Sequence, residues 1–185
     1  RDADIGSPVA LGFVPVPDVG SFFVVGIVAA VVTFATTPLV GRLAVRMGWV
    51  YEPNERTVHT HPLPDVGGIA MFLGCAVGLA VAWTMGDFES LFASNSEPIG
   101  VVIAALIIFA TGFVDDIHEL SAPAKVFGTV LAGVALVYFG VVMYSFHVPY
   151  LGTVILSPDL QPLVTVLWLI GMSHAINLID GLDGL

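Results

Sequence analysis

Five apolar segments, each near 20 residues in length, dominate this sequence and constrain its fold more than any other feature. An α-helix needs about 20 such residues to cross the hydrocarbon core of a bilayer. Helix is also the spanning form that the sequence favours, because it lacks the alternating short strands typical of a transmembrane barrel. The sequence therefore predicts an all-α, polytopic integral membrane protein with about five transmembrane helices. We place them at residues 21–40, 68–85, 99–114, 125–146 and 160–179.

The composition supports a membrane setting and excludes several classes of protein. Of the 185 residues, 57% are hydrophobic and 11% are charged, whereas a soluble domain has about 25% charged residues. Disordered chains, coiled coils and nucleic-acid-binding modules all need more charge than this. The formal net charge of −10 also has the wrong sign for a surface that binds polyanions. A phosphate substrate would therefore be held through a bound divalent cation.

Small residues and proline shape the apolar segments. Pro38 lies near the end of the first segment and is expected to kink or end its helix. Gly74 and Gly78 are four residues apart in the second segment, so they form a face suited to close helix contact. The single cysteine, Cys75, lies in the same segment and is interpreted as a packing residue.

The basic residues predict the orientation of the chain, because lysine and arginine concentrate in cytoplasmic loops. Arg42, Arg46 and Arg56 lie between the first and second segments, and Lys125 lies between the third and fourth. The loop between the second and third segments carries acids and no base. We therefore expect residues 1–20 to be extracytoplasmic and the fifth helix to end at the cytoplasmic side. Three polar clusters then share that side.

The first cluster is a pair of adjacent carboxylates, Asp115 and Asp116, that closes the third segment. The two acids repel each other, and the dipole at the C-terminal end of a helix adds to that cost. A bound Mg²⁺ would relieve both, since this ion takes one or two carboxylates together with substrate phosphates. A solvated pair of acids at the membrane boundary is the alternative, and both interpretations stay open. Lys125 follows near the start of the fourth segment, as a cytoplasmic anchor, a phosphate ligand or a partner of Asp115 or Asp116.

The second cluster places a polar residue at every third position where the fifth segment ends. Its members are His174, Asn177, Asp180 and Asp183. Neighbours three residues apart lie on one side of a helix, and the intervening glycines allow the backbone to approach a ligand closely. A frayed helix end would explain the glycines but not the spacing of the polar residues. Ionisable groups in a membrane segment are functional by default, so we interpret this cluster as functional.

The third cluster is a proline-rich loop, residues 52–68, between the first and second segments. Arg56 could bind a phosphate through two hydrogen bonds, and the glycine pair that ends the loop permits a tight turn. His59 and His61 could share a metal ion, but no cysteine or third histidine lies nearby to complete a zinc site. Taken alone, this loop is interpreted as solvated surface.

Together the three clusters resemble the polyprenyl-phosphate N-acetylhexosamine-1-phosphate transferases of bacterial envelope synthesis. The likeness is strongest to the undecaprenyl-phosphate branch that transfers N-acetylglucosamine 1-phosphate, which is related to phospho-MurNAc-pentapeptide translocase. The matching loop residues are Pro53, Asn54, Arg56, His59, Pro62, Pro64, Gly67 and Gly68. The matching acid segment comprises Asp115, Asp116, Leu120, Ser121, Ala122 and Lys125. Asn177 to Leu185 match the family motif without a gap.

The resemblance implies an enzyme that transfers a sugar 1-phosphate from a UDP-sugar to polyprenyl phosphate and releases UMP. It implies Mg²⁺ as cofactor, with Mn²⁺ as the alternative, and an active site that faces the cytoplasm. The implied catalytic residues are Asp115, Asp116, Asp180 and Asp183. The implied metal ligands are Asp115, Asp116, Asn177 and Asp180. The implied substrate-binding residues are Asn54, Arg56, His59, Lys125 and Asn177.

One of the two adjacent acids would deprotonate or orient the lipid phosphate. The implied partners are the two substrates and the lipid bilayer, without nucleic acid, and a homodimer stays open. Family members continue for several further helices, so residues 21–185 are expected to be the N-terminal part of a single membrane-embedded domain. By this reasoning the chain is expected to be inactive alone.

Two other functions stay open from the residues. An alcohol phosphatidyltransferase of the CDP-lipid class also begins its motif with Asp-x-x-Asp-Gly, which residues 180–184 satisfy. A membrane cation transporter could use the same acids along a pathway. Transport predicts acids at mid-membrane depth, whereas the acids here lie at helix ends.

Overall fold

The computed structural model describes residues 17–51, 63–64, 67–93, 96–150 and 152–180. Its five long helices correspond to the five apolar segments, which confirms the predicted all-α architecture. They are α1 (Val19–Met47), α2 (Gly68–Thr84), α4 (Glu97–His118), α5 (Ala122–Tyr138) and α6 (Leu160–Asp180). Two short helices, η1 (Gly86–Phe88) and α3 (Glu89–Ala93), follow α2.

The helices α1, α4 and α6 are each long and apolar enough to cross a membrane. A fourth span arises if α2 and the short helices that follow it are counted as one broken span, because the two parts pass together in length and hydropathy. They meet at a bend of 90°. The remaining apolar helix, α5, has 17 residues, which is the lower end of the length that spans a bilayer. The chain is therefore a multi-pass membrane protein.

The exposed surface is apolar, as expected for helices that face lipid. Large side chains point outward along the helices, and Phe34 of α1 and Tyr138 of α5 are 84% and 83% exposed. The side chains buried within the helices are mostly small. They include Ala44, Ala70, Ala82, Ala104 and Ala132. Small residues allow the backbones of membrane helices to approach closely, and this packing replaces a conventional hydrophobic core.

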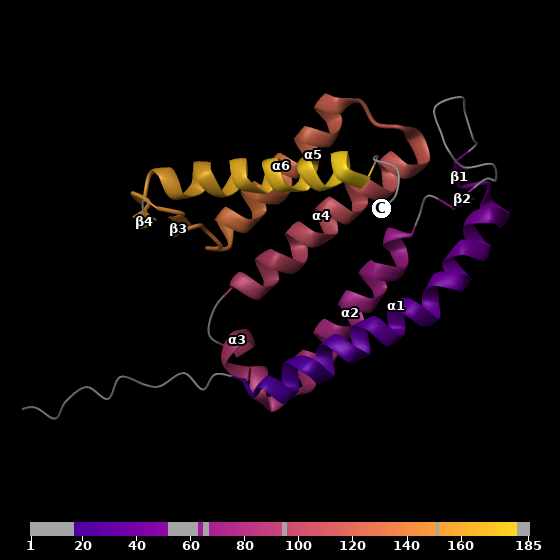
Figure 1. Ribbon diagram of the computed structural model, residues 1–185, viewed down its shortest axis with the longest axis horizontal. Coiled ribbons are helices and arrows are strands. Elements are labelled where there is room, and N and C mark those ends of the chain that lie inside the picture. Colours follow the sequence, from indigo (N-terminus) through magenta and orange to yellow (C-terminus); the bar gives the residue numbers. More distant parts are fainter. Residues whose placement is uncertain (1–16, 52–62, 65–66, 94–95, 151, 181–185) are drawn as a thin grey trace, which may run out of the picture.

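The long helices form two groups (Figure 1). The helices α1 and α2 lie side by side as one pair, whereas α5 packs against both α4 and α6 in the other group. Gly74 of α2 faces α1 so closely that a Cβ atom there would lie 2.6 Å from the carbonyl oxygen of Ala29. The predicted contact through Gly74 and Gly78 is thus confirmed. Stacked rings of Phe72 and Phe109, with centroids 4.1 Å apart, connect α2 to α4.

One end of the molecule gathers the segments that the sequence places on the cytoplasmic side. Figure 1 shows the C-terminal ends of α1, α4 and α6 there, together with the N-terminal ends of α2 and α5. A ring contact of Trp49 with Phe113, at 5.4 Å, links the chain beyond α1 to α4. Two short strands, β1 (Val50–Tyr51) and β2 (Leu63–Pro64), pair antiparallel at this end.

The predicted helix over residues 125–146 is wrong in its second half. The helix α5 ends at Tyr138, and the chain then forms an antiparallel hairpin of β3 (Ser145–Val148) and β4 (Gly152–Ile155). Gly140 lies two residues beyond the end of α5 and has a φ of 90°. Glycine adopts this left-handed conformation without strain, and it stops the helix. Hydropathy alone did not reveal this end, because valine and aromatic residues suit strands as well as membrane helices.

Of the two outcomes expected for Pro38, a kink or an end of the helix, the end is wrong, since α1 continues through it to Met47. Membrane helices tolerate proline where hydroxyl side chains bond to nearby carbonyl groups. The hydroxyl groups of Thr36 and Thr37 donate to the carbonyl oxygens of Val32 and Thr33, each at 2.7 Å. The carbonyl group that Pro38 leaves without its helical donor is that of Phe34, so these bonds do not replace the lost one; bonds of this kind often bend a helix.

Candidate functional site

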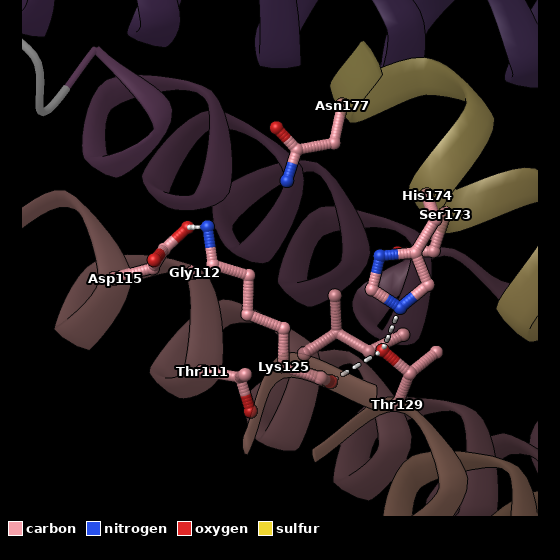
Figure 2. A pocket seen from close by; sticks show the side chains of 9 residues that line it. Thr111, Gly112, Asp115, Lys125, Thr129, Ser173, His174 and Asn177 are labelled. Atoms are coloured by element: carbon pink, nitrogen blue, oxygen red, sulfur yellow. Dashed lines mark hydrogen bonds and ion pairs between the residues drawn. The ribbon is translucent and has the colours of Figure 1, made fainter. Parts of the chain in front are cut away.

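A polar pocket of about 70 Å³ lies where α4, α5 and α6 meet (Figure 2). It is close to the C-terminal ends of α4 and α6 and the N-terminal end of α5. The residues that line it are Ile108, Thr111, Gly112, Asp115, Lys125, Thr129, Ser173, His174 and Asn177. Most of these side chains are polar, in a group of helices whose other surfaces are apolar.

Asp115 and Lys125 form an ion pair across the turn between α4 and α5. The Nζ atom of Lys125 lies 2.7 Å from Oδ2 of Asp115, and the two side chains are 32% and 17% exposed. Each charge is unfavourable at its own helix end, since an acid lies in the last turn of α4 and a base in the first turn of α5. The pairing offsets both costs and fixes Lys125 over the pocket.

The turn itself holds Asp115 in place. The backbone N–H of Leu120 donates to Oδ1 of Asp115 at 2.9 Å. The backbone N–H of Glu119, a residue with φ of 45°, donates to the carbonyl oxygen of Asp115 and ends α4. Ser121 occupies the N-cap position of α5. Asp115 is therefore part of the turn that connects the two helices as well as part of the pocket.

The helix α6 contributes the opposite wall of the pocket. Figure 2 shows the amide of Asn177 and the imidazole of His174 facing the side chain of Lys125. The Nε2 atom of His174 lies 3.5 Å from Oγ1 of Thr129, whose hydroxyl group donates to the carbonyl oxygen of Lys125 at 3.0 Å. A chain of polar contacts thus links α6 through Thr129 to the first turn of α5.

The structure brings together three of the predicted site residues, namely Asp115, Lys125 and Asn177. Asp116 is exposed on the next position of α4 and is not among the residues that line the pocket. Asp180 is the last residue of α6, and its side chain lies outside the described part of the chain. Four further predictions fall on residues outside the described ranges, namely Asn54, Arg56, His59 and Asp183.

Sequence reasoning missed three polar residues of the pocket, which are Thr111, Thr129 and Ser173, whereas it included His174 in a cluster interpreted as functional. Helical spacing contained the signal for two of them. Thr111 precedes Asp115 by one helical turn, and Thr129 follows Lys125 by one turn, so each shares a face with a predicted residue. His174 belonged to the polar stripe on the fifth segment but was given no part in the chemistry.

The donor chemistry of the pocket fits Mg²⁺. Asp115 and Asn177 line the same pocket and carry the hard oxygen donors that this ion prefers, whereas the hydroxyl group of Thr111 donates to the carbonyl oxygen of Ile107. Within the described ranges there is no group of three or more His, Cys, Asp and Glu side chains placed to hold one metal ion. Mg²⁺ needs only one or two carboxylates from a protein when substrate phosphates supply the rest. Lys125 takes up one of the carboxylate oxygens that the ion would use.

Comparison with known proteins identifies a family over the part of the chain that builds this pocket. Residues 98–185 match glycosyl transferase family 4. Decaprenyl-phosphate N-acetylglucosaminephosphotransferase of Mycobacterium leprae is 36% identical over 163 residues, which cover 87% of this chain and 41% of the relative. The probable undecaprenyl-phosphate N-acetylglucosaminyl 1-phosphate transferase of Bacillus subtilis is 34% identical over 159 residues, 86% of this chain and 42% of that protein.

A more distant relative is phospho-N-acetylmuramoyl-pentapeptide-transferase of Mycolicibacterium paratuberculosis. It is 30% identical over 187 residues, which cover 85% of this chain and 50% of the relative. The chain thus spans about two fifths of the length of the first two relatives. No solved structure matches it significantly.

Proposed function

We propose that this chain, whose residues 98–185 match glycosyl transferase family 4, is part of a polyprenyl-phosphate sugar-1-phosphate transferase. The proposed reaction moves a sugar 1-phosphate, N-acetylglucosamine 1-phosphate by analogy with the relatives, from a UDP-sugar to polyprenyl phosphate. UMP is the second product. In this proposal the reaction is the first membrane step in the synthesis of a cell-envelope polysaccharide.

The observation that carries the proposal is the Asp115–Lys125 pair in a small polar pocket at one end of an otherwise apolar helix group. Phosphoryl transfer depends mainly on positioning and on neutralisation of charge. An ammonium group held at 2.7 Å by a carboxylate is oriented before a substrate arrives. The hydroxyl group of Ser173 and the amide group of Asn177 add hydrogen-bond donors for a phosphate beside it.

Roles follow for the described residues. Lys125 contacts a phosphate group, Asp115 orients Lys125, and Asn177 binds the nucleotide-sugar from the α6 side. Asn54, Arg56 and His59 supply further contacts to the substrate phosphates, as the resemblance implies. Mg²⁺, held by Asp115, Asp116, Asn177 and Asp180, would neutralise the diphosphate when bound.

The same proposal includes the side of the membrane on which the reaction takes place. Arg42, Arg46 and Lys125 all lie at the end of the molecule that holds the pocket, and basic residues favour the cytoplasmic side. UDP-sugars would therefore reach the pocket from the cytoplasm. Lipid-facing apolar surfaces on the surrounding helices would allow polyprenyl phosphate to approach within the bilayer.

The test is transfer of label from UDP-N-acetylglucosamine to polyprenyl phosphate by the full-length protein in membranes. We expect a labelled lipid and an equal amount of UMP. Asp115→Asn should lower kcat/KM about 100-fold, because Lys125 loses its anchor. The matched control is Asp159→Asn, which changes an exposed acid before α6 and should leave the rate unchanged. Absence of labelled lipid, or transfer from a CDP-lipid instead, contradicts the proposal.

A further inference from the structure

Two arginines near the C-terminal end of α1 line an open groove of about 430 Å³. The groove is formed by Pro38, Gly41, Arg42, Val45 and Arg46, and we call it the arginine groove. Arg42 and Arg46 are four residues apart, so their guanidinium groups lie on one side of the helix. The other three residues are compact and apolar, and they leave space beside the two bases.

The charge of the arginine groove is not balanced within the part of the chain that the structure describes. Lys125 is paired with Asp115, whereas no acid in the described ranges forms an ion pair with Arg42 or Arg46. The helix α1 contains no acidic residue along its whole length. Its dipole favours a base in the last turn, where Arg46 lies, but that effect fades before Arg42. An anion is therefore the ligand whose charge complements the groove.

The arginine groove faces away from α2. A Cβ atom at Gly74 of α2 would meet the backbone of Ala29 and the side chain of Thr33, so these two residues mark the side of α1 that packs on α2. Val31 lies midway between them in the sequence, about 200° around the helix from each. Eleven residues, or close to three full turns, separate Val31 from Arg42, so both lie on the side away from α2. Figure 1 shows α1 along the outer edge of the molecule, with α2 on its inner side.

An apolar stripe continues from the arginine groove toward the middle of α1. Its members, Ile27, Val31 and Phe34, lie on the same side of the helix and are each 60% or more exposed. The distance along the helix from Val31 to Arg42 is about 16 Å. One leaflet of a bilayer contributes about 15 Å of hydrocarbon. The stripe thus matches the acyl chains of one leaflet, with the two arginines at the depth of the headgroup phosphate.

We propose that this side of α1 is a binding site for an anionic phospholipid. The guanidinium groups of Arg42 and Arg46 hold the phosphate through paired hydrogen bonds, and the acyl chains lie along the apolar stripe. Basic pockets on membrane helices recognise anionic headgroups by this chemistry. A zwitterionic lipid fits less well, because its own ammonium group lies beside the phosphate and is repelled by the arginines. The site is separate from the polar pocket and does not depend on the proposed reaction.

The test identifies the molecule that lies on the apolar stripe of the full-length protein. The photoreactive residue p-benzoylphenylalanine is placed in the position of Phe34, and the protein is reconstituted in vesicles of equal amounts of phosphatidylglycerol and phosphatidylcholine. Illumination joins this residue to its neighbour, and mass spectrometry identifies the adduct. We expect adducts of phosphatidylglycerol to exceed those of phosphatidylcholine about 10-fold, because each of the two bases adds to the attraction for an anionic lipid.

The matched control places the same photoreactive residue in the position of Phe127. Phe127 is an exposed phenylalanine on α5, and the base nearest to it in sequence, Lys125, is already paired with Asp115. We expect this position to capture the two lipids about equally. An equal preference for phosphatidylglycerol at both positions would reflect the membrane as a whole and would overturn a site on α1.

Two double variants test the role of the guanidinium pair. Arg42→Gln with Arg46→Gln removes both charges and should bring the ratio of the two lipids at position 34 to about 1. Arg42→Lys with Arg46→Lys keeps the charges but loses the planar, two-bond geometry, so the ratio should fall to about 3. An unchanged ratio in the lysine variant would reveal diffuse attraction and overturn a defined site. The comparison of positions 34 and 127 needs neither variant, so it holds even if one of them fails to fold.

Other occupants of the stripe would overturn the proposal in recognisable ways. An adduct with a later segment of the same chain, or with a second copy, would make the stripe a protein contact. Equal capture of the two lipids at position 34 would leave the arginines as anchors of the helix alone. If excess inorganic phosphate abolished the preference, the groove would bind free phosphate in place of a lipid. A preference for phosphatidylglycerol that disappears with both arginines supports the proposal, whether or not the protein transfers a sugar phosphate.

Discussion

The α1–α2 pair and the α4–α5–α6 group are both packed through glycine, yet they differ in the polar side chains that lie at their helix contacts. Glycine brings the backbones together in both, at Gly74 beside Ala29 in the pair and at Gly128 beside Thr111 in the group. The described residues of α1 and α2 share no side-chain hydrogen bond or ion pair. In the second group, by contrast, Lys125 pairs with Asp115 across the helix turn.

This difference separates packing from chemistry. Close glycine contacts hold membrane helices together without any specific polar group. Polar side chains between membrane helices are costly, so they persist where function needs them. We infer that the α1–α2 pair acts mainly as a support, whereas the α4–α5–α6 group carries the reactive residues. Variants that damage one property and leave the other intact can test this division.

The largest effect is expected for Lys125→Met, which keeps much of the apolar length of the side chain and removes its charge. Loss of a charged phosphate ligand should lower kcat/KM about 100- to 1,000-fold. The unfolding midpoint should change little, because the ion pair is partly exposed. Arg42→Met is the control, since Arg42 is an exposed base on α1. If both variants lost activity to the same degree, the division between the two groups would be wrong.

Much of this arrangement could be predicted from the sequence, because apolar length and small-residue spacing act locally. The five helices and the contact of Gly74 follow from those two signals. The meeting of Asp115, Lys125 and Asn177 was predicted only from the combined motif, since they lie on three different helices. The end of α5 at Tyr138 could not be predicted from hydropathy, because the apolar run continues into the hairpin strand β3.

The role of Thr129 was missed for a different reason. A threonine in an apolar segment is unremarkable until its neighbours on adjacent helices are known. Only the packing of α5 against α6 shows that its hydroxyl group bridges Lys125 and His174. Tertiary contacts of this kind leave no periodic signal in a single sequence. That Thr111 shares a helix face with Asp115 was predictable from their spacing, whereas the contact of Thr129 with His174 on another helix was not.

The next effect is on stability. Gly74→Leu should lower the free energy of unfolding by about 3 kcal/mol, because the new side chain meets the backbone of Ala29 and the side chain of Thr33. Gly26→Leu is the control, since a Cβ atom at Gly26 meets nothing within 4 Å. Unfolding in a mixed detergent measures both variants. The activity of each folded molecule should stay near that of the wild type, and a loss of kcat/KM without loss of stability would contradict the supporting role of this pair.

The smallest effect is expected at the opposite end of the molecule, where the hydroxyl group of Ser21 bonds to the carboxylate of Asp87. Ser21 is 6% exposed, and beside it Phe22 packs edge-on against the buried ring of Phe88 at 5.3 Å. Ser21→Ala should cost about 1 kcal/mol of stability, since the exposed carboxylate can bond to water instead. Ser157→Ala, an exposed serine before α6, should cost less.

The same pair of variants distinguishes a polar contact that supports the fold from one that takes part in a reaction. Ser21→Ala should leave kcat/KM and its pH profile unchanged, because the contact joins α1 to η1, far from the pocket (Figure 1). Assays of transfer and of unfolding on the same preparation measure both quantities. If Ser21→Ala lowered the transfer rate as strongly as it lowered stability, the two ends of the molecule would be coupled. Polar contacts outside the α4–α5–α6 group would then have to be counted as part of the working site.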